Sequence, residues 1–443
     1  MRAETLAPIR RISVIGLGKL GAVVAGCHAS RGFDVIGVDI DARAVEHVAC
    51  GKPPVPEPGI EELYAMGRAR LTATQDMRAA VQDSDASLVV VPTPSDADGG
   101  YSLAHALRVC EEIGAGLSSK EGYHLVAMKS TVLPGACAAD LIPALEEASG
   151  KRCGEDFGFC YSPEFIALGS VIHDIFHPDL VVLGESDRLA GDLVEGIYRR
   201  LLQAEPPLAR MNLVNAELSK LAVNAYVTMK ITFANSLARI CERLAGGDVD
   251  AVTGALGMDS RIGPKYLKGG LGFGGPCFPR DNRAMLSLAR RLGVPFSLAE
   301  STDATNLDPA RAVVERVVAR APAGARVGVL GLSYKPDTPV VEQSQGVFIA
   351  RLLRERGFQV TTYDPLAMDS ARRELGDQVK YAESAQAAVD DHSAVVIATP
   401  WPEFGSLDYS AMGLGDPLVV DCWGILADHD GTGRVRLGAW SSR

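Results

Sequence analysis

Near its amino end the chain reads Arg11-Ile-Ser-Val-Ile-Gly16-Leu-Gly-Lys-Leu-Gly21. The apolar residues before Gly16 are typical of a buried strand, and the small residues that follow Gly21 as far as Ser30 are typical of a helix packed closely on a sheet. A second apolar run occupies residues 34–39. Strand, glycine-rich turn, helix and strand in this order predict a βαβ opening and hence a parallel sheet.

The glycines Gly16, Gly18 and Gly21 have the Gly-x-Gly-x-x-Gly spacing of a dinucleotide-binding turn. Asp39 lies 39 − 16 = 23 residues after Gly16, near the place of the acid that accepts hydrogen bonds from the adenosine ribose. An acid there repels a 2′-phosphate, so the sequence predicts NAD rather than NADP. The alternative is a glycine-rich turn in a domain that binds no nucleotide, but strand, helix and acid together favour the cofactor.

Further strand-like runs at residues 87–91, 124–129 and 180–183 alternate with helical stretches. This alternation predicts that the first part of the chain, residues 1–210, forms a parallel sheet covered on both faces. The second α/β pattern starts near residue 321, with a strand at 326–330, Gly331, a loop to Gln345, a helix, and a strand that ends at Asp364. It has no third glycine in register, so this unit binds a different nucleotide or none.

Residues 212–244 contain no Gly or Pro and carry apolar side chains at helical spacing. They predict one helix longer than ordinary globular helices, which needs burial along its whole length. We expect it to link two domains and to form the core of a dimer. The fold class is therefore α/β, with two Rossmann-like parallel-sheet domains, 1–210 and 321–443, joined by a long central helix within a helical dimerisation region, 211–320.

Composition excludes several classes of protein. The formal charge of −11 disfavours a nucleic-acid partner, which needs a basic surface, but leaves a small anionic ligand possible. Apolar runs such as 88–91 are far shorter than the roughly 18 residues of a membrane span, and residues 1–11 lack the apolar segment of a signal peptide. The nine cysteines include no Cys-x-x-Cys pair, which favours reduced thiols. We expect a soluble cytoplasmic protein without a membrane partner.

A second glycine-rich segment, Gly269-Gly-Leu-Gly-Phe-Gly-Gly-Pro-Cys277-Phe-Pro-Arg-Asp281, carries the chemistry. Residues 269–275, here called the glycine loop, hold five glycines, too many for a packed core, so we expect their backbone to approach a ligand. Cys277 is placed to act as a nucleophile, with Asp281 within reach if a helix begins there. For the other cysteines, including Cys50, a buried structural role is expected.

Lys220 and Asn224 lie four residues apart in the predicted long helix and therefore share a face. Facing a pocket, the two side chains can donate hydrogen bonds to an oxyanion. A solvated polar stripe is the alternative. His173 and His177 have the same spacing but no third ligand, and we assign no metal.

Several further motifs occur in one order over nearly the whole chain, which resembles the UDP-glucose/GDP-mannose dehydrogenases. The motifs are Pro56-Glu-Pro-Gly59, Val91-Pro-Thr93-Pro, Lys129-Ser-Thr131-Val, Ser162-Pro-Glu164-Phe, Glu217-Leu-Ser-Lys220 with Asn224, Arg261-Ile-Gly, Gly272-Phe-Gly-Gly-Pro-Cys277-Phe-Pro-Arg-Asp281 and Gly331-Leu-Ser-Tyr-Lys335-Pro.

The resemblance implies an NAD-dependent enzyme that oxidises the C6 alcohol of a nucleotide sugar twice, to the uronate. Cys277 then adds to the intermediate aldehyde and carries a thiohemiacetal and a thioester. Lys220 and Asn224 stabilise oxyanions, Asp281 positions a water or accepts a proton, and Thr131 and Glu164 order the catalytic water. UDP-glucose is the expected substrate, bound by a nucleotide-sugar-binding domain at 321–443.

The resemblance also implies the ligand contacts and a homodimer or larger homo-oligomer, with Arg261 reaching the neighbouring subunit's site. The expected cofactor contacts are Gly16, Gly18, Lys19, Leu20, Gly21, Asp39, Arg43, Thr93, Thr131, Gly275 and Cys277. The expected substrate contacts are Glu164, Phe165, Ile166, Lys220, Asn224, Arg261, Tyr266, Leu267, Lys268, Gly269, Gly270, Phe273, Gly274, Tyr334 and Lys335.

Three departures from the family pattern concern the ligand. Leu168 stands where many members carry a second glutamate, Glu342-Gln343 replaces an Arg-Glu pair, and Asp421-Cys-Trp-Gly424 replaces a stretch that often supplies an arginine to the sugar. Two alternatives stay open. One keeps the chemistry but takes dTDP-glucose, a UDP-N-acetylhexosamine or GDP-mannose. The other is a catalytically silent NAD-binding regulatory protein, which the joint presence of Cys277, Lys220, Asn224 and Asp281 argues against.

Overall fold

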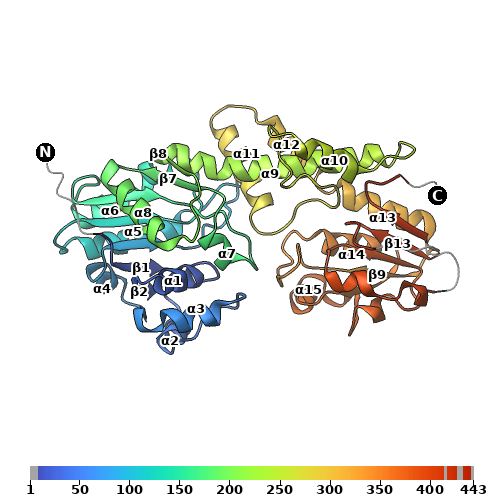
Figure 1. Cartoon of the computed structure of the whole chain (residues 1–443), viewed down its shortest axis with the longest axis horizontal. Helices are drawn as coiled ribbons and strands as arrows, with labels where there is room; N and C mark the ends of the chain where they lie inside the picture. The colour runs from blue at the N-terminus through green and yellow to red at the C-terminus, as the bar shows by residue number, and fades with distance from the viewer. Residues whose placement is uncertain (1–7, 414–416, 427–432, 441–443) are drawn as a thin grey trace. The chain divides into compact units, whose positions relative to one another are not determined.

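The structure is a computed structural model that describes residues 8–413, 417–426 and 433–440. The chain divides into two compact units, Met1–Ala222 and Val223–Arg443. Each unit is built around one sheet with helices on its faces (Figure 1). Among the described residues, no helix is both long enough and apolar enough to cross a membrane.

The first unit holds an eight-stranded sheet of order β3-β2-β1-β4-β5-β6-β7-β8, as expected for an α/β fold. Every residue of β4, β5 and β6 is buried, the pattern of strands covered by helices on both faces. The strands are β1 (Arg11–Ile15), β2 (Asp34–Val38), β3 (Leu71–Thr74), β4 (Ala86–Val89), β5 (His124–Met128), β6 (Phe157–Tyr161), β7 (Val181–Glu185) and β8 (Leu208–Asn212). The main helices are α1 (Gly21–Ser30), α2 (Ala42–Ala49), α3 (Ile60–Gly67), α4 (Met77–Gln82), α5 (Ala104–Leu117), α6 (Ile142–Ser149), α7 (Val171–Phe176) and α8 (Arg188–Leu201).

The order of the strands reverses between β1 and β4, both of which pair in parallel with their neighbours. In open α/β sheets, ligands bind in the crevice outside the carboxyl ends of the strands at such a point. The glycine turn after β1 and the segments that follow β4 and β5 lie at this edge.

The expectation of a wholly parallel sheet is wrong at one pair. β6 and β7 run antiparallel, with Cys160 opposite Glu185 and Tyr161 opposite Gly184. A parallel return requires a crossover that covers the sheet, usually with a helix. The connection here contains only α7, which has 6 residues, and the chain reverses direction instead.

The predicted long helix is confirmed as α9 (Leu213–Cys241), a single helix of 29 residues. Burial along its whole length is not observed in the single chain. Tyr226, Phe233 and Ile240 are 56%, 52% and 55% exposed. These residues are spaced by seven, so they lie on one face of the helix and leave an apolar stripe uncovered.

The second unit contains α10 (Val249–Met258), α11 (Phe278–Arg291), α12 (Ser297–Thr305) and α13 (Asp308–Arg320), followed by the second α/β pattern. Its sheet has the order β11-β10-β9-β12-β13-β14, and the pairs are parallel. The strands are β9 (Arg326–Leu330), β10 (Gln359–Tyr363), β11 (Lys380–Tyr381), β12 (Ala394–Ile397), β13 (Leu418–Asp421) and β14 (Gly433–Arg436), with α14 (Gln345–Glu355) and α15 (Met368–Leu375).

The first strand of each α/β pattern ends at a glycine in the same conformation. Gly16 follows β1 with φ +98°, and Gly331 follows β9 with φ +97°. A Cβ on Gly16 would collide with the carbonyl oxygen of Val90, and one on Gly331 would collide with the backbone and side chain of Thr399. Both glycines are therefore required by the turn and by the close approach of the neighbouring strand's end.

We expect Gly331→Ala to destabilise the second unit far more than Gly357→Ala. Gly357 also has positive φ, +86°, but a Cβ there would meet no atom within 4 Å. The control should lose about 1 kcal/mol of unfolding free energy, from backbone strain alone. Gly331→Ala should lose at least about 2 kcal/mol more, because Thr399 must move.

Urea unfolding followed by tryptophan fluorescence measures this difference, since Trp401, Trp423 and Trp440 all belong to the second unit. Equal losses in the two variants would show that the turn relaxes around an added Cβ.

Candidate active site

The three glycines of the first turn have three different environments. Gly16 adopts positive φ, and a Cβ on Gly21 would collide with the carbonyl oxygen of Gly16, so α1 packs directly on the turn. Gly18 is exposed, and a Cβ there would meet no atom within 4 Å. The open side of the turn is therefore at Gly18, where a ligand can approach the backbone.

The amino end of α1 suits an anion. Its first turn carries no acidic residue, and the exposed Lys19 precedes it. The partial positive charge at the start of a helix favours a phosphate there. Leu20 is half-buried against the apolar core, so its backbone rather than its side chain is placed to contact a ligand. The turn fits the diphosphate of a dinucleotide.

Asp39 follows β2 and is half-buried. Its carboxylate accepts hydrogen bonds from the backbone N–H of Leu17 at 2.6 Å and of Asp41 at 2.8 Å. An ionised carboxylate has about four acceptor positions, so these bonds leave capacity for ribose hydroxyls. Next to it Ile40 is 89% exposed, an apolar surface beside the acid that the sequence analysis missed. Arg43 lies on the surface against Asp41 at 3.3 Å.

Asp364, which follows β10 in the second unit, has the same place after its strand but a different environment. It is buried, and Trp401 Nε1 reaches its carboxylate at 3.3 Å. Further donors to this carboxylate are Leu332 N, Ser333 N, Ser333 Oγ, Leu366 N and Ala367 N. With its acceptor positions engaged by the protein, Asp364 is not available to a ribose as Asp39 is.

The threonines expected at the cofactor come together at the carboxyl ends of β4 and β5. Thr93 is buried, and its hydroxyl donates to the carbonyl oxygen of Thr131 at 2.7 Å. Ser130 reinforces the contact, because its hydroxyl donates to Val91 O at 2.7 Å and accepts from Val91 N at 2.9 Å. The two loops are thus tied to each other.

Glu164 forms an ion pair that the sequence analysis missed. The buried ammonium of Lys129 lies 2.6 Å from Glu164 Oε1 and 2.7 Å from the hydroxyl of Tyr198, which in turn is 2.7 Å from Ser162 Oγ. Burial acts to lower the pKa of Lys129, but the Glu164 carboxylate and Tyr198 raise it above its ordinary value. Lys129 is therefore a permanent cation that holds the Glu164 carboxylate in place.

Lys220 approaches the same segment from α9. Its ammonium donates to the carbonyl oxygen of Glu164 at 2.7 Å and lies 4.4 Å from the centre of the Phe165 ring. Ile166 packs against the apolar core. The structure thus brings together Glu164, Phe165 and Lys220, as the sequence analysis expected of substrate contacts.

In the second unit Asn224 and Asp281 form a buried pair. The Asn224 amide donates to Asp281 Oδ2 at 2.6 Å, and Asp281 is 1% exposed. One turn further along α9, the Thr228 hydroxyl donates to Asn282 Oδ1 at 3.1 Å. Two consecutive turns of α9 are therefore bonded to the first turn of α11.

Cys277 is the residue directly before α11, and it is exposed. Its carbonyl oxygen accepts from Asp281 N at 2.8 Å, the first intrahelical bond. The helix therefore begins where the sequence analysis placed it. A thiol at the amino end of a helix is favoured as the thiolate, the form that acts as a nucleophile.

The glycines of the loop are packed closely by the protein, and the expected approach of a ligand to their backbone stays a prediction. A Cβ on Gly270 would press on the ring of Trp423, one on Gly272 would collide with Asn306, and one on Gly275 would press on the ring of Tyr334. Gly269 and Gly274 are closed in the same way, by Val249 and by Gln343. The missing side chains make room for the protein itself, which composition alone cannot distinguish from room for a ligand.

Aromatic rings gather around Phe278, the residue after Cys277. Tyr266 and Phe273 meet its ring edge-on, with centroids at 6.2 and 6.4 Å. Tyr334 lies against Gly275, and burial, followed by the nearness of Cys277 and Tyr266, raises its pKa to about 12. Tyr334 is therefore a neutral hydrogen-bonding group at physiological pH.

The other predicted substrate contacts differ in their exposure to solvent. Leu267 is buried, Lys268 is exposed and Lys335 is half-buried. Arg261 is exposed and pairs with Asp259 at 2.6 Å in the single chain. Cys50, expected to be buried, is exposed, because it follows α2, in which only Val48 is buried.

Comparison with known proteins identifies three consecutive matches along the chain. Residues 10–202 match the NAD binding domain of the UDP-glucose/GDP-mannose dehydrogenase family, residues 214–308 its central domain, and residues 328–428 its UDP binding domain.

Full-length relatives agree with these matches. The UDP-glucose 6-dehydrogenase AglM of Haloferax volcanii is 36% identical over 427 residues, which cover 95% of this chain and 98% of the relative. The GDP-mannose 6-dehydrogenase of Pseudomonas aeruginosa is 36% identical over 415 residues, covering 93% of each. The solved structure of a UDP-glucose dehydrogenase from Pyrobaculum islandicum superposes with a TM-score of 0.89 at 35% identity and covers 100% of both chains.

We expect Lys129→Met to destabilise the first unit by about 3 kcal/mol, because it leaves the Glu164 carboxylate without its buried cation. The double variant Lys129→Met, Glu164→Gln should recover part of this loss, since no unpaired charge remains. Lys52→Met is the control, an exposed lysine whose loss should change stability by less than about 0.5 kcal/mol. Chemical unfolding followed by circular dichroism measures all three, and a loss no larger than the control's would contradict the ion pair.

Proposed function

Because the chain belongs to the UDP-glucose/GDP-mannose dehydrogenase family, we propose that it oxidises the C6 alcohol of UDP-glucose twice, with NAD, to the uronate. The observation that carries this proposal is the Cys277 thiol, exposed at the amino end of α11 and preceded by the tightly held glycine loop. GDP-mannose is the second candidate substrate, since a GDP-mannose 6-dehydrogenase is as similar to this chain, at 36% identity, as a UDP-glucose enzyme.

Bound NAD would accept the hydride in each of the two oxidations. The backbone at Gly18 and the amino end of α1 would hold its diphosphate, and Asp39 would accept the adenosine ribose hydroxyls. Thr93 and Thr131, tied together beyond β4 and β5, would border the nicotinamide.

The first oxidation removes a hydride from C6 and the hydroxyl proton, leaving an aldehyde. The Cys277 thiolate adds to the aldehyde carbon, and the oxyanion that forms takes up a proton to give a thiohemiacetal. Loss of a second hydride from C6 and of the hydroxyl proton gives a thioester. Water then adds to the thioester, and the carbon–sulfur bond breaks to release the carboxylate and restore the thiolate.

We assign the remaining roles to groups whose contacts suit them. Lys220, fixed by the carbonyl oxygen of Glu164, and Asn224, fixed by Asp281, would donate to the oxyanions. Glu164, held by Lys129, would accept a hydrogen bond from the hydrolytic water together with Thr131. Asp281, which is buried and bonded to Asn224, would position a water or accept a proton from it.

We also propose a cytoplasmic homodimer. The apolar stripe of Tyr226, Phe233 and Ile240 on α9 is the surface that a second copy would cover, with Arg261 then contributing to the partner's substrate site. A contiguous exposed apolar face on a helix is typical of a protein–protein interface.

Cys277→Ser should abolish uronate formation while leaving nucleotide-sugar binding intact, because a hydroxyl does not ionise near neutral pH to attack the aldehyde. Cys50→Ser, which changes the other exposed cysteine, is the control and should keep full activity. NADH formation and uronate are measured with a panel of nucleotide sugars. Uronate formation by Cys277→Ser at anything near the unmodified rate would remove the covalent role.

Asp39→Asn should weaken NAD binding and raise the relative use of NADP by at least about tenfold, because the repulsion of a 2′-phosphate is lost. The control is Asp41→Asn, which removes a neighbouring charge and keeps an oxygen that can still cap α2. The ratio of kcat/KM for the two cofactors is the measurement. Equal kcat/KM with both cofactors in the unmodified protein would refute the assignment.

A further inference from the structure

The glycine loop is held in place by side-chain hydrogen bonds and not by secondary structure. Residues 269–276 form neither helix nor strand, and five of the seven loop residues are glycine, which loses more backbone freedom on ordering than any other residue. The position of Cys277, directly after this segment, depends on what fixes the loop.

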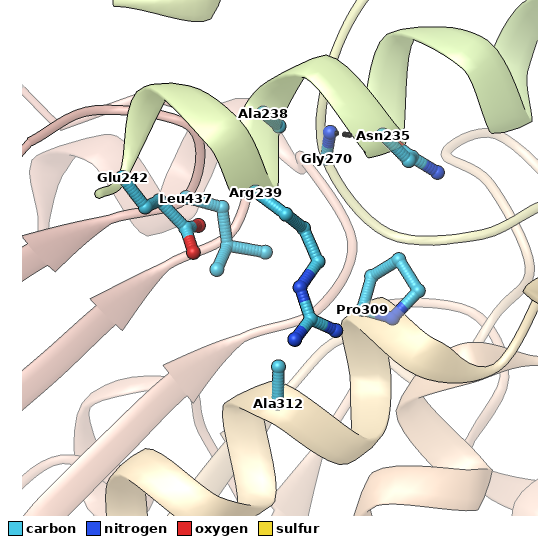
Figure 2. Close-up of a pocket in the computed structure, with 8 residues that line it drawn as sticks. All are labelled: Asn235, Ala238, Arg239, Glu242, Gly270, Pro309, Ala312 and Leu437. Atoms are coloured by element: carbon cyan, nitrogen blue, oxygen red, sulfur yellow. Dashed lines mark hydrogen bonds between the residues drawn. The ribbon is translucent and has the colours of Figure 1, made fainter. Parts of the chain in front are cut away.

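Asn235 of α9 fixes the start of the loop. Its side-chain oxygen accepts from Gly270 N at 2.9 Å, and its amide nitrogen donates to Leu271 O at 3.1 Å. Figure 2 shows Asn235 directed from α9 at the backbone of Gly270, beside a small cavity. Asn235 is 6% exposed, so both of its polar groups are engaged away from water.

Asn306, between α12 and α13, fixes the middle of the loop in the same manner. Its side-chain oxygen accepts from Phe273 N and its amide nitrogen donates to Phe273 O, both at 2.8 Å. A Cβ on the preceding Gly272 would collide with the backbone and side chain of Asn306. The contact therefore requires glycine on one side and a carboxamide on the other.

One ring contact connects the backbone segment that these asparagines hold to the residue beside Cys277. Phe273, whose backbone Asn306 holds, packs edge-on against Phe278, the residue that follows Cys277. A carboxamide carries its donor and its acceptor on separate atoms, so it can satisfy a backbone N–H and a backbone carbonyl at once, and each asparagine does so here. Apolar side chains would be enough to bury the loop, whereas two carboxamides that each bond the loop backbone also fix its position.

We infer that Asn235 and Asn306 are positioning residues, which hold the glycine loop so that the Cys277 thiol captures the aldehyde before it escapes. The inference rests on the proposed function, in which Cys277 is the nucleophile. The first hydride transfer does not need the thiol, whereas capture requires the sulfur to be held close to the aldehyde carbon. A loosened loop should therefore release aldehyde rather than stop the first oxidation.

The test uses Asn306→Asp and Asn235→Asp in the full chain. Aspartate keeps the size and the acceptor oxygen, removes the donor, and places a negative charge against a carbonyl oxygen. Asn306 is half-buried and tolerates the change better than Asn235. Gly272→Ala disturbs the same contact from the loop side. The control is Asn215→Asp, the same change on an exposed residue of α9.

Hydrogen exchange of the peptide that contains the loop should become about tenfold faster in each test variant, the effect of losing about one hydrogen bond, and should not change in the control. With saturating UDP-glucose and a hydroxylamine trap, the test variants should release trapped aldehyde while the rate of the first oxidation stays within about twofold. Without substrate, alkylation of Cys277 relative to the exposed Cys50 in the same sample should fall by about threefold, since the thiol spends less time at the amino end of α11.

An unchanged rate of hydrogen exchange in all test variants would show that the two asparagines do not hold the glycine loop. Faster exchange with no trapped aldehyde and an unchanged alkylation ratio would show that the asparagines stabilise the fold only and would overturn the positioning role. If the unmodified protein oxidises no nucleotide sugar, the proposed function fails, and the alkylation ratio alone then decides whether the asparagines position the thiol.

Discussion

The buried hydrogen bond from Asn224 to Asp281 is the interaction on which the position of Cys277 depends. It joins α9 to the first turn of α11, and the N–H of Asp281 closes that turn on the carbonyl oxygen of Cys277. Cys277, the proposed nucleophile, therefore lies at a helix terminus that is bonded to α9. Removal of Asn224 would take one donor from a buried carboxylate that Arg280 also approaches, at 3.4 Å, and the loss of that donor costs more than the hydrogen bond itself contributes. The same side chain that we assign to an oxyanion is thus also the one that places the sulfur.

The two α/β patterns contain the same strand-ending glycine turn, but the aspartates beside the two turns differ in their hydrogen-bond partners. In both, a glycine at positive φ ends the first strand and an aspartate follows the second. Asp39 keeps acceptor capacity at a half-exposed edge, whereas Asp364 is buried and surrounded by donors from two loops and from Trp401. One carboxylate remains open to a ligand, and the other has become an internal anchor. Shared topology therefore does not imply a shared cofactor, and it is the hydrogen-bond partners of the acid that separate the two cases.

Features set by local sequence could be predicted, and features set by distant partners could not. The strands, the 29-residue α9 and the start of α11 follow from periodicity and turn chemistry, which a short window contains. The antiparallel β6–β7 pair depends on how a connection packs, and the contact of Lys129 with Tyr198 spans 69 residues, so neither leaves a local signal. The close packing of the glycine loop by the protein leaves no local signal for a different reason. Its composition reveals where side chains are missing, but the occupants of that space, Asn306 and Tyr334, lie elsewhere in the chain.

Two of the three departures from the expected family pattern make backbone contacts in the fold. Glu342 stands in place of a family arginine, yet its contact with the glycine loop is made by its carbonyl oxygen, which accepts from Gly275 N at 2.9 Å. Gly424 likewise contributes its backbone N–H to Asp421 at 2.8 Å. Leu168 packs against the apolar core in place of a second carboxylate. The contact of Glu342 is made by its backbone, so another side chain there can keep it, whereas Gly424 has φ +68°, a conformation that a side chain would strain. Glu342 is exposed, so at this position the departure from the expected arginine changes the surface charge while the backbone contact with Gly275 is kept.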